Sequence, residues 1–127
     1  MTRLEYFSRT ELLIGSAALQ KLAASHVMVF GIGGVGSFVV EGLVRAGVGK
    51  LTLVDDDQIC PTNINRQLHA TSRTIGRPKV EVMRERVLEI NPRATVTGIA
   101  NFYLPENAQE FFATPCDYIV DAIDTVT

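Results

Sequence analysis

The sequence predicts an α/β protein with a Rossmann-like, doubly wound and mainly parallel sheet. Short apolar runs that suit buried strands alternate along the chain with amphipathic segments that suit helices. A glycine-rich turn follows the first of these runs, and no low-complexity linker or internal repeat interrupts the alternation. With 127 residues, the chain is long enough to bury one core but too short for two domains of ordinary size.

The composition is that of a soluble globular protein. Lysine and arginine total 12 against 14 aspartate and glutamate residues, and 46% of all residues are hydrophobic. The net charge of -2 gives no overall attraction to nucleic acid or to an anionic membrane. Cys60 and Cys116 form no C-x-x-C pair, which argues against a disulfide framework and a self-contained zinc site. Because no segment has the apolar length of a leader or a membrane span, we expect a cytoplasmic protein with no membrane partner.

The first half of the chain predicts two helices and two strands. Residues 10–24 suit an amphipathic helix with Thr10 as its N-cap. The run 26–30 predicts a buried strand that ends at glycines, and helix is expected from 35 to 46, followed by a second strand at 51–55. The apolar residues near helical spacing in the first helix are Leu12, Leu13, Ala17, Leu19, Leu22 and Ala23.

The second half predicts two more helices and two more strands. Pro78 suits the first turn of a helix that the pair 91–92 ends. A strand is expected at 94–100, a short helix within 105–113 and a fourth strand at 118–124. The expected buried stripe of the longer helix is Val80, Met83, Val87 and Ile90. A doubly wound fold normally continues past its fourth strand, so we expect the N-terminal part of a domain that is truncated after this strand.

Glycines between the first strand and the following helix predict a phosphate-binding turn. Gly31, Gly33 and Gly36 have the G-x-G-x-x-G spacing, and Gly34 is an additional glycine. The first glycine permits a tight turn, the second lets backbone N–H groups approach phosphate, and the third lets helix and strand pack closely. Asp55 follows nineteen residues after Gly36, at the end of the second strand, where it can accept hydrogen bonds from ribose hydroxyls.

Polar residues after this point favour a ligand with more charge than NAD. Asn63, Arg66, Gln67 and Lys79 fall in a loop and at the start of a helix. Arginine can hold phosphate oxygens through two hydrogen bonds and lysine supplies a point charge, whereas the pyrophosphate of NAD needs little beyond the glycine turn. A triphosphate explains these residues better than NAD does. The competing interpretation is that Arg66 and Lys79 belong to ordinary solvated surface.

Five motifs in order carry a resemblance to a known superfamily. "GIGGVGS", "LVDDD", "TNINRQ", "GRPK" and "DAID" resemble those of the adenylating superfamily that includes ubiquitin-activating enzymes and the bacterial MoeB, ThiF and HesA proteins. The stretches "RTELLIG", "NINRQLHA" and "GRPKVEVMRERVLEINP" are most similar to the tRNA threonylcarbamoyladenosine dehydratase branch. On this resemblance, residues 1–127 are the N-terminal ATP-binding part of a single Rossmann-like ThiF-type domain.

The resemblance implies a role for each matching residue. Asp55 would hold the ribose, and Asp57 would support the same site. Asp124 would be the Mg²⁺-associated aspartate, and Arg9 would reach the phosphates from a partner subunit. The residues implied to bind ATP are Gly31, Gly33, Gly34, Gly36, Asp55, Asp57, Asn63, Arg66, Gln67 and Lys79, and those implied to act in catalysis are Arg9, Arg66, Lys79 and Asp124.

The resemblance implies adenylation of a carboxylate with ATP and Mg²⁺ as cofactors. In the most similar branch the substrate would be the threonyl carboxylate of N6-threonylcarbamoyladenosine in tRNA, with net dehydration to a cyclic product, and a homodimer and a cysteine desulfurase system would be partners. The alternative within enzymes is adenylation of the C-terminal glycine of a ubiquitin-like sulfur carrier. A catalytically idle nucleotide-binding scaffold and an NAD-dependent oxidoreductase are the alternatives from other classes.

Several reactive residue types have simpler interpretations. A single histidine such as His69, with no placed partner, is more often structural than catalytic. Cys60 and Cys116 suit small core or loop positions rather than a thioester nucleophile, because nothing nearby indicates a lowered thiol pKa. Asp121 at the end of the fourth strand is given no direct role. The basic residues Arg77, Lys79, Arg84, Arg86 and Arg93 alternate with Glu81, Glu85 and Glu89, which favours a solvated helix face with Glu–Arg pairs over an RNA-binding patch.

Overall fold

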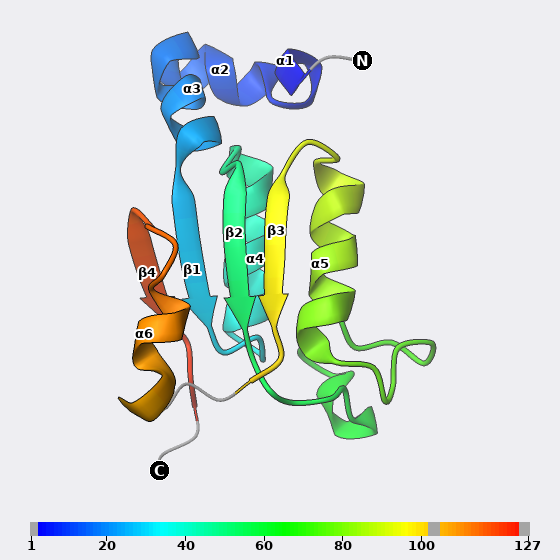
Figure 1. Cartoon of the computed structure of the whole chain (residues 1–127). Helices are drawn as coiled ribbons and strands as arrows, with labels where there is room; N and C mark the ends of the chain where they lie inside the picture. Colours follow the sequence, from blue (N-terminus) through cyan, green and yellow to red (C-terminus); the bar gives the residue numbers. More distant parts are fainter. Residues whose placement is uncertain (1–2, 102–104, 125–127) are drawn as a thin grey trace.

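The chain folds as a parallel sheet with helices on its faces and at its ends (Figure 1). This computed structural model describes residues 3–101 and 105–124. The elements in chain order are α1 (Arg3–Tyr6), α2 (Ser8–Ile14), α3 (Ser16–Ala24), β1 (His26–Phe30), α4 (Gly36–Ala46), β2 (Lys50–Val54), η1 (Pro61–Asn63), α5 (Lys79–Ile90), β3 (Thr95–Ile99), η2 (Pro105–Asn107), α6 (Ala108–Phe111) and β4 (Tyr118–Asp121).

The strand order of the sheet is β3-β2-β1-β4, and every pairing is parallel. The chain therefore builds outward from β1 to β3 on one side and then returns to place β4 on the other side of β1. In open α/β sheets, ligands bind outside the carboxyl ends of the strands where the order reverses in this way. The predicted α/β, Rossmann-like fold class is confirmed, and the reversal lies between β1 and β4.

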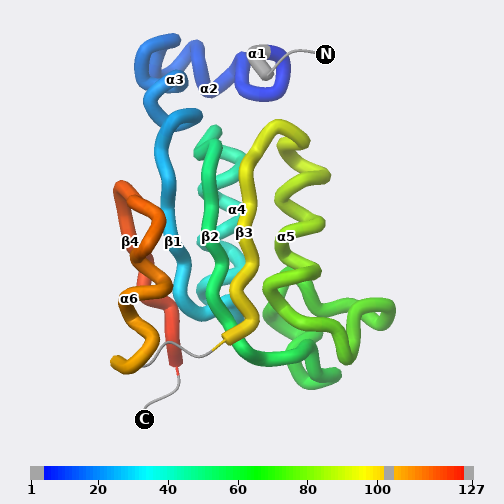
Figure 2. The backbone as a smooth tube through the Cα atoms, viewed as in Figure 1, coloured from blue at the N-terminus to red at the C-terminus, as the bar shows by residue number. Residues whose placement is uncertain are grey.

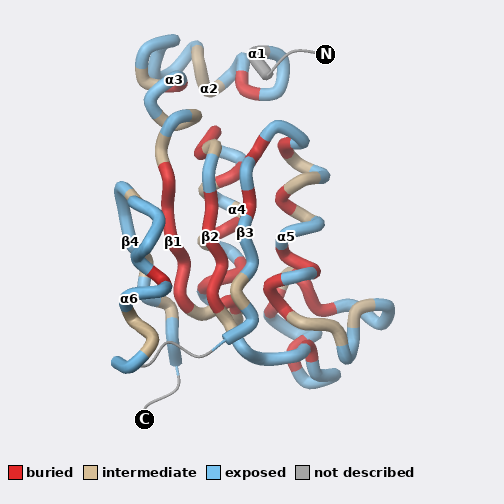
Figure 3. Tube along the Cα trace, in the orientation of Figure 1, coloured by how far each residue is buried: buried red, intermediate tan, exposed pale blue. Residues whose placement is uncertain are grey.

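The two faces of the sheet are covered unequally (Figures 1 and 3). Val27 and Val29 of β1 face the main core, which α4 and α5 cover. Alternate residues Met28 and Phe30 face a smaller cluster that includes Phe111 of α6. This alternation follows from the two-residue period of a strand. The expected stripe of α5 is largely confirmed, because Val80, Met83 and Val87 are buried and Ile90 is partly buried.

An ion-pair cluster joins α4 to α5 beside the main core. Glu41 of α4 accepts hydrogen bonds from Arg86 of α5 at 2.6 and 3.0 Å and from Arg45 at 2.9 Å. The hydrogen bond from Arg86 is the main cause that lowers the pKa of Glu41. On the exposed side of α5, Arg77 pairs with Glu81 and Glu85, as the alternation of charges predicts.

The predicted single helix over 10–24 is wrong, because the chain breaks at Gly15 into α2 and α3 (Figure 2). Gly15 has φ +87°, a conformation outside the right-handed helix that costs glycine little. Leu12 and Leu13 are 87% and 86% exposed, so they do not form the buried stripe that the spacing suggests. Leu19 of α3 is buried, and it is the one buried residue of α3.

The remaining boundaries agree with the prediction within the usual uncertainty of helix and strand ends, except near 105–113. There the structure has the short helices η2 and α6 in place of one helix. Pro78 precedes α5 rather than forming its first turn. Within the described residues, no helix is both long and apolar enough to cross a membrane.

Candidate nucleotide-binding site

A pocket of about 850 Å³ lies at the carboxyl end of the sheet. The segments after all four strands contribute to it: Gly31 follows β1, Asp55 follows β2, Asn101 follows β3 and Asp124 follows β4. Carboxyl ends of parallel strands meet at one edge of a sheet, so residues far apart in the sequence come together there. The pocket is lined by Gly31, Gly33, Gly34, Val35, Phe38, Val54, Asp55, Asp56, Asp57, Asn63, Arg66, Gln67, Lys79, Asn101, Ala122, Ile123 and Asp124.

The glycine turn has little room for side chains at two of its positions. Gly31 has φ +91°, and a Cβ there would lie 2.5 Å from the carbonyl oxygen of Ala122. A Cβ at Gly36 would lie 1.6 Å from the carbonyl oxygen of Gly31. Gly36 does not line the pocket; it lets the first turn of α4 approach the end of β1. At Gly33 and Gly34 a Cβ would meet only side chains at ordinary contact distance, so backbone crowding does not require glycine there.

Asp55 connects the end of β2 to the glycine turn. One carboxylate oxygen accepts a hydrogen bond from the Ile32 N–H at 2.7 Å, and the other accepts one from the Asp57 N–H at 2.8 Å. Each oxygen keeps further lone-pair capacity, so the carboxylate can still accept hydrogen bonds from the hydroxyl groups of a sugar. Partial desolvation, together with the charge of Asp57, raises the pKa of the neighbouring Asp56.

Lys79 places a buried positive charge at the pocket. It is the first residue of α5, and its side chain is 8% exposed. Its backbone N–H donates to the Asp57 carbonyl at 3.1 Å, which fixes the start of the helix against the loop after β2. The ammonium group lies 3.7 Å from a carboxylate oxygen of Asp57, its ion-pair partner within the described residues. A buried ammonium with so long a pairing distance can accommodate an anionic ligand.

The segment around η1 supplies three further polar side chains. Asn63 is buried, and its side-chain oxygen accepts the Cys60 N–H at 2.8 Å, so its amide group remains to donate. Arg66 is exposed and donates to the Thr62 carbonyl at 3.0 Å and to Asn65 at 2.8 Å. Gln67 is buried, and its side-chain oxygen has no hydrogen-bond partner among the residues that the structure describes.

The structure brings ten of the twelve residues predicted from the sequence to the pocket lining and leaves out Gly36 and Arg9. Asp124 is exposed and lines the pocket after β4. Arg9 is exposed on α2, which lies across the amino ends of the strands, at the opposite end of the sheet (Figure 1). Arg9 therefore does not contribute to the pocket of its own chain.

Some lining residues were not predicted from the sequence. Asn101 directly follows the expected third strand, and the rule that polar residues after parallel strands gather at one edge could have found it. Asp56 was overlooked between two predicted residues. The apolar part of the wall had no sequence signal, because apolar residues near a strand or helix are ordinarily part of the core. These apolar residues are Val35, Phe38, Val54, Ala122 and Ile123.

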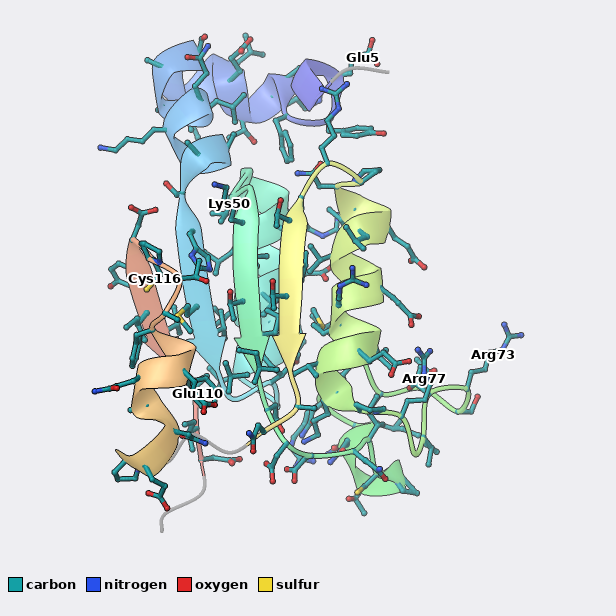
Figure 4. All side chains as sticks on the ribbon, in the orientation of Figure 1. Glu5, Lys50, Arg73, Arg77, Glu110 and Cys116 are labelled. Carbon is teal, nitrogen blue, oxygen red and sulfur yellow. The ribbon has the colours of Figure 1, made fainter. Side chains whose placement is uncertain are left out.

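The other reactive residues do not line the pocket. Arg73 points outward from the loop before α5, and Arg77 lies along the exposed side of this helix (Figure 4). Arg84 donates to the Val96 carbonyl at 3.1 Å, so it is a structural side chain. Cys60 is exposed and Cys116 is partly buried, and both are free thiols. His69 is buried at 2% exposure, as expected for a structural histidine.

Comparison with known proteins finds matches over nearly the whole chain. The ThiF family matches residues 7–127. The chain is 49% identical over 123 residues to tRNA threonylcarbamoyladenosine dehydratase of Bacillus subtilis (strain 168), covering 97% of this chain and 48% of the relative. It is 35% identical over 108 residues to molybdopterin-synthase adenylyltransferase of Salmonella typhimurium, covering 85% of this chain and 43% of the relative.

A solved structure has nearly the same arrangement of backbone. The crystal structure of E. coli tRNA N6-threonylcarbamoyladenosine dehydratase in complex with ATP matches with a TM-score of 0.94 and 45% identity, over 97% of this chain and 51% of that chain. The chain spans about half the length of the curated relatives that it matches.

Proposed function

Because the chain belongs to the ThiF family, we propose that it is the ATP-binding part of an enzyme that adenylates a carboxylate. The main support for this proposal is the burial of the Lys79 side chain at the pocket. Its ammonium group is buried at the pocket and pairs only loosely with Asp57, so it supplies the kind of charge that a triphosphate requires and a dinucleotide does not. Residues 1–127 then correspond to the ATP-binding part of a Rossmann-like ThiF-type domain.

Each end of the nucleotide has suitable partners in this pocket. Gly33 and Gly34 offer backbone N–H groups at the start of α4, where an anion is favoured. Asp55 can accept hydrogen bonds from the ribose hydroxyl groups. Lys79 and Arg66 can offset the negative charge of the outer phosphates. ATP would supply an adenylyl group to a carboxylate oxygen and lose pyrophosphate, and these residues would orient the phosphates for that transfer.

Asp124 is our proposed magnesium ligand. Its exposed carboxylate lines the same pocket as Asp55, Asp56 and Asp57, whose oxygens lie within 4.8 Å of one another. Mg²⁺ is usually bound by one or two carboxylates together with phosphate oxygens and water, so the donor set of the pocket fits this ion. The ion would neutralise phosphate charge.

For the substrate, we propose the threonyl carboxylate of N6-threonylcarbamoyladenosine in tRNA, which is activated and then cyclised with net dehydration. The supporting observation is the difference in identity between the dehydratase relative, at 49%, and the molybdopterin-synthase adenylyltransferase, at 35%. Activation of a sulfur-carrier protein is therefore the less favoured candidate. A cysteine desulfurase system as partner and a cytoplasmic location remain proposals that rest on the family resemblance.

We further propose a homodimer in which Arg9 acts on the phosphates of the partner subunit. In its own chain Arg9 lies on α2, beyond the amino ends of the strands. The five residues of β1, at a rise of about 3.3 Å each, separate the two ends of the sheet by about 16 Å. Any contact between Arg9 and a bound phosphate therefore requires a second chain.

Product analysis tests the proposed function. The protein is incubated with ATP, Mg²⁺ and tRNA that carries N6-threonylcarbamoyladenosine, and the nucleotides are separated. We expect AMP and pyrophosphate in amounts that depend on the modified tRNA. Pyrophosphate release that depends instead on a ubiquitin-like carrier protein would support the second candidate, whereas release of ADP alone would contradict adenylation.

A further inference from the structure

We propose that His69 is a positioning residue that aims the backbone N–H of Gly33 into the nucleotide pocket. It does so by holding the carbonyl group of Ile32, the residue between the first two glycines of the turn. The ligand in this inference is a nucleotide phosphate, so that part of the inference rests on the proposed function. The geometry of the turn itself does not.

Among the described residues the ring of His69 makes one hydrogen bond, and that bond fixes its tautomer. Its Nε2 atom lies 2.8 Å from the carbonyl oxygen of Ile32. A carbonyl oxygen can only accept, so Nε2 carries the proton and donates it. Burial is the largest cause that lowers the pKa of His69, which favours the neutral ring. Nδ1 is then a bare acceptor, and it has no partner among the described residues.

The unpartnered nitrogen argues that His69 is more than a core-filling residue. A buried acceptor without a hydrogen bond lowers stability, and an apolar side chain of similar size would avoid this cost. His26, the other histidine of the chain, has both ring nitrogens within hydrogen-bond distance of partners, the Pro115 carbonyl and the Thr52 hydroxyl. The bond from Nε2 of His69 to Ile32 is therefore the interaction that accounts for a histidine at this position.

Ile32 is held at both of its peptide groups. Its N–H donates to Asp55 at 2.7 Å, and its carbonyl accepts from His69. Asp55 follows β2 and His69 belongs to the loop before α5, so two separate segments fix the orientation of the turn. The side chain of Ile32 is fully buried, which prevents the residue from shifting toward solvent.

The orientation of the Ile32 carbonyl determines that of the Gly33 N–H. The peptide bonds of the described chain are not cis, and in a planar trans peptide the carbonyl and the N–H point in opposite directions. With the carbonyl turned inward to His69, the Gly33 N–H points away from that ring, and Gly33 lines the pocket. Within the described residues no protein group accepts this N–H.

In the preceding peptide, between Gly31 and Ile32, the carbonyl and the N–H also point in opposite directions. The Ile32 N–H points to Asp55, so the Gly31 carbonyl must point the opposite way. It does point away, toward the first turn of α4, where a Cβ on Gly36 would lie 1.6 Å from this oxygen. His69 itself does not line the pocket, so it acts through the backbone and not by contact with the ligand.

Two variants separate positioning from core filling. In His69→Gln the side-chain amide can still donate to the Ile32 carbonyl, whereas in His69→Met the side chain fills the space without a donor. Binding of ATP and of adenosine, which has no phosphate, is measured by calorimetry for each protein, with thermal unfolding as the stability control. For His69→Met we expect about a tenfold loss of ATP affinity, with adenosine affinity within about twofold of the unsubstituted protein. His69→Gln should keep most of the ATP affinity.

Nuclear magnetic resonance of the ligand-free protein measures signals that a purely core-filling role of His69 would not affect. The ¹⁵N spectrum of the His69 ring should show a protonated Nε2 and a bare Nδ1. The amide signal of Gly33 should move in His69→Met and move much less in His69→Gln. This measurement uses no nucleotide, so it decides the positioning claim even if the unsubstituted protein fails to bind ATP, a result that would instead overturn the proposed function.

Three results would overturn the role of His69. One is a proton on Nδ1 in place of Nε2. Another is an equal loss of ATP and adenosine affinity in His69→Met. The third is equal behaviour of the glutamine and methionine variants, including equal Gly33 amide shifts.

Discussion

The amino and carboxyl ends of the sheet differ in how completely their buried polar groups are hydrogen-bonded. At the amino end, the backbone and ring of His26 bond to Asp117, Pro115 and Thr52. At the carboxyl end, the side-chain oxygen of Gln67 and Nδ1 of His69 are buried without partners among the described residues. Protein interiors normally satisfy such groups, so among the described residues the carboxyl end of the sheet is the end with incomplete hydrogen bonding.

The two ends also differ in what they expose. The carboxyl end gathers glycine backbone and charged side chains around one pocket. Across the amino end, α2 presents Leu12 and Leu13 to solvent, and Arg9 belongs to the same helix. One chain therefore supplies ten of the predicted residues to a single pocket, whereas Arg9 lies at the opposite end of the sheet, as the proposed dimer requires.

Two glycines, one at each end, give the largest expected effects. A Cβ at Gly36 would lie 1.6 Å from the Gly31 carbonyl, and a Cβ at Gly49 would lie 1.9 Å from the Ala23 carbonyl. Each alanine substitution should destabilise the fold by about 3 kcal/mol, the upper end for overpacking. Only Gly36→Ala should also abolish ATP binding at temperatures where the protein is folded, because it displaces the glycine turn.

Gly42→Ala is the matched control for these variants, since it lies in α4 and a Cβ there meets nothing within 4 Å. It should raise the free energy of unfolding by roughly 0.5–1 kcal/mol. Calorimetry and thermal unfolding measure both quantities. If Gly49→Ala lost ATP affinity as completely as Gly36→Ala, ATP binding would not depend on the carboxyl end of the sheet alone.

Mixed dimers test the position of Arg9 at the amino end. Arg9→Ala and Asp124→Ala should each be nearly inactive, because every site then lacks one residue. After the two are unfolded and annealed together, random pairing gives about half mixed dimers, so about a quarter of all sites should regain both residues. No recovery of activity, despite mixed dimers seen by mass spectrometry, would show that Arg9 does not act across subunits.

Lys79→Met should weaken ATP binding without weakening the fold. Loss of a charged hydrogen bond to phosphate predicts a fall in affinity of about tenfold to a hundredfold. The methionine keeps an apolar stem in the buried space and leaves Asp57, which is 66% exposed, in contact with water, so the melting temperature should not fall. Lys21→Met on α3, where the lysine is exposed, is the control and should change neither quantity. Equal ATP affinity of the Lys79 variant and the unsubstituted protein would exclude Lys79 from the site.

The smallest expected effect is the pH dependence that His69 gives to stability. Its folded pKa lies below the ordinary value of 6.5 because of burial and, to a lesser extent, the charge of Lys79, while its hydrogen bond to Ile32 and the charge of Asp55 act in the opposite direction. Below pH 6.5 the unfolded chain therefore binds more protons than the folded chain, so stability falls as the pH drops, by at most about 1.4 kcal/mol per pH unit for one group. Denaturant unfolding of the unsubstituted protein and His69→Gln between pH 7 and 5 should show a shallower decline in the variant. An identical decline would contradict this assignment.

Much of this arrangement could be predicted from the sequence, because it follows from local patterns. Strand-like runs and the glycine turn identify the fold class, and the position of Asp55 after a strand brings it to the pocket. The break at Gly15 was not predicted, since an isolated glycine is tolerated within a helical pattern. Helical spacing places Leu12 and Leu13 among the apolar residues of the first helix, but spacing alone does not determine burial, and both side chains are exposed. The bond from His69 to Ile32 joins residues 37 apart, and no local pattern indicates it.

Calorimetry of nucleotide binding shows whether the carboxyl end of this sheet holds the phosphates of ATP, as we propose. The protein is titrated with ATP in the presence of Mg²⁺, and separately with NADH, whose pyrophosphate would suit the same glycine turn. We expect ATP to bind and NADH to give no measurable heat. Tight binding of NADH together with no binding of ATP would contradict this proposal.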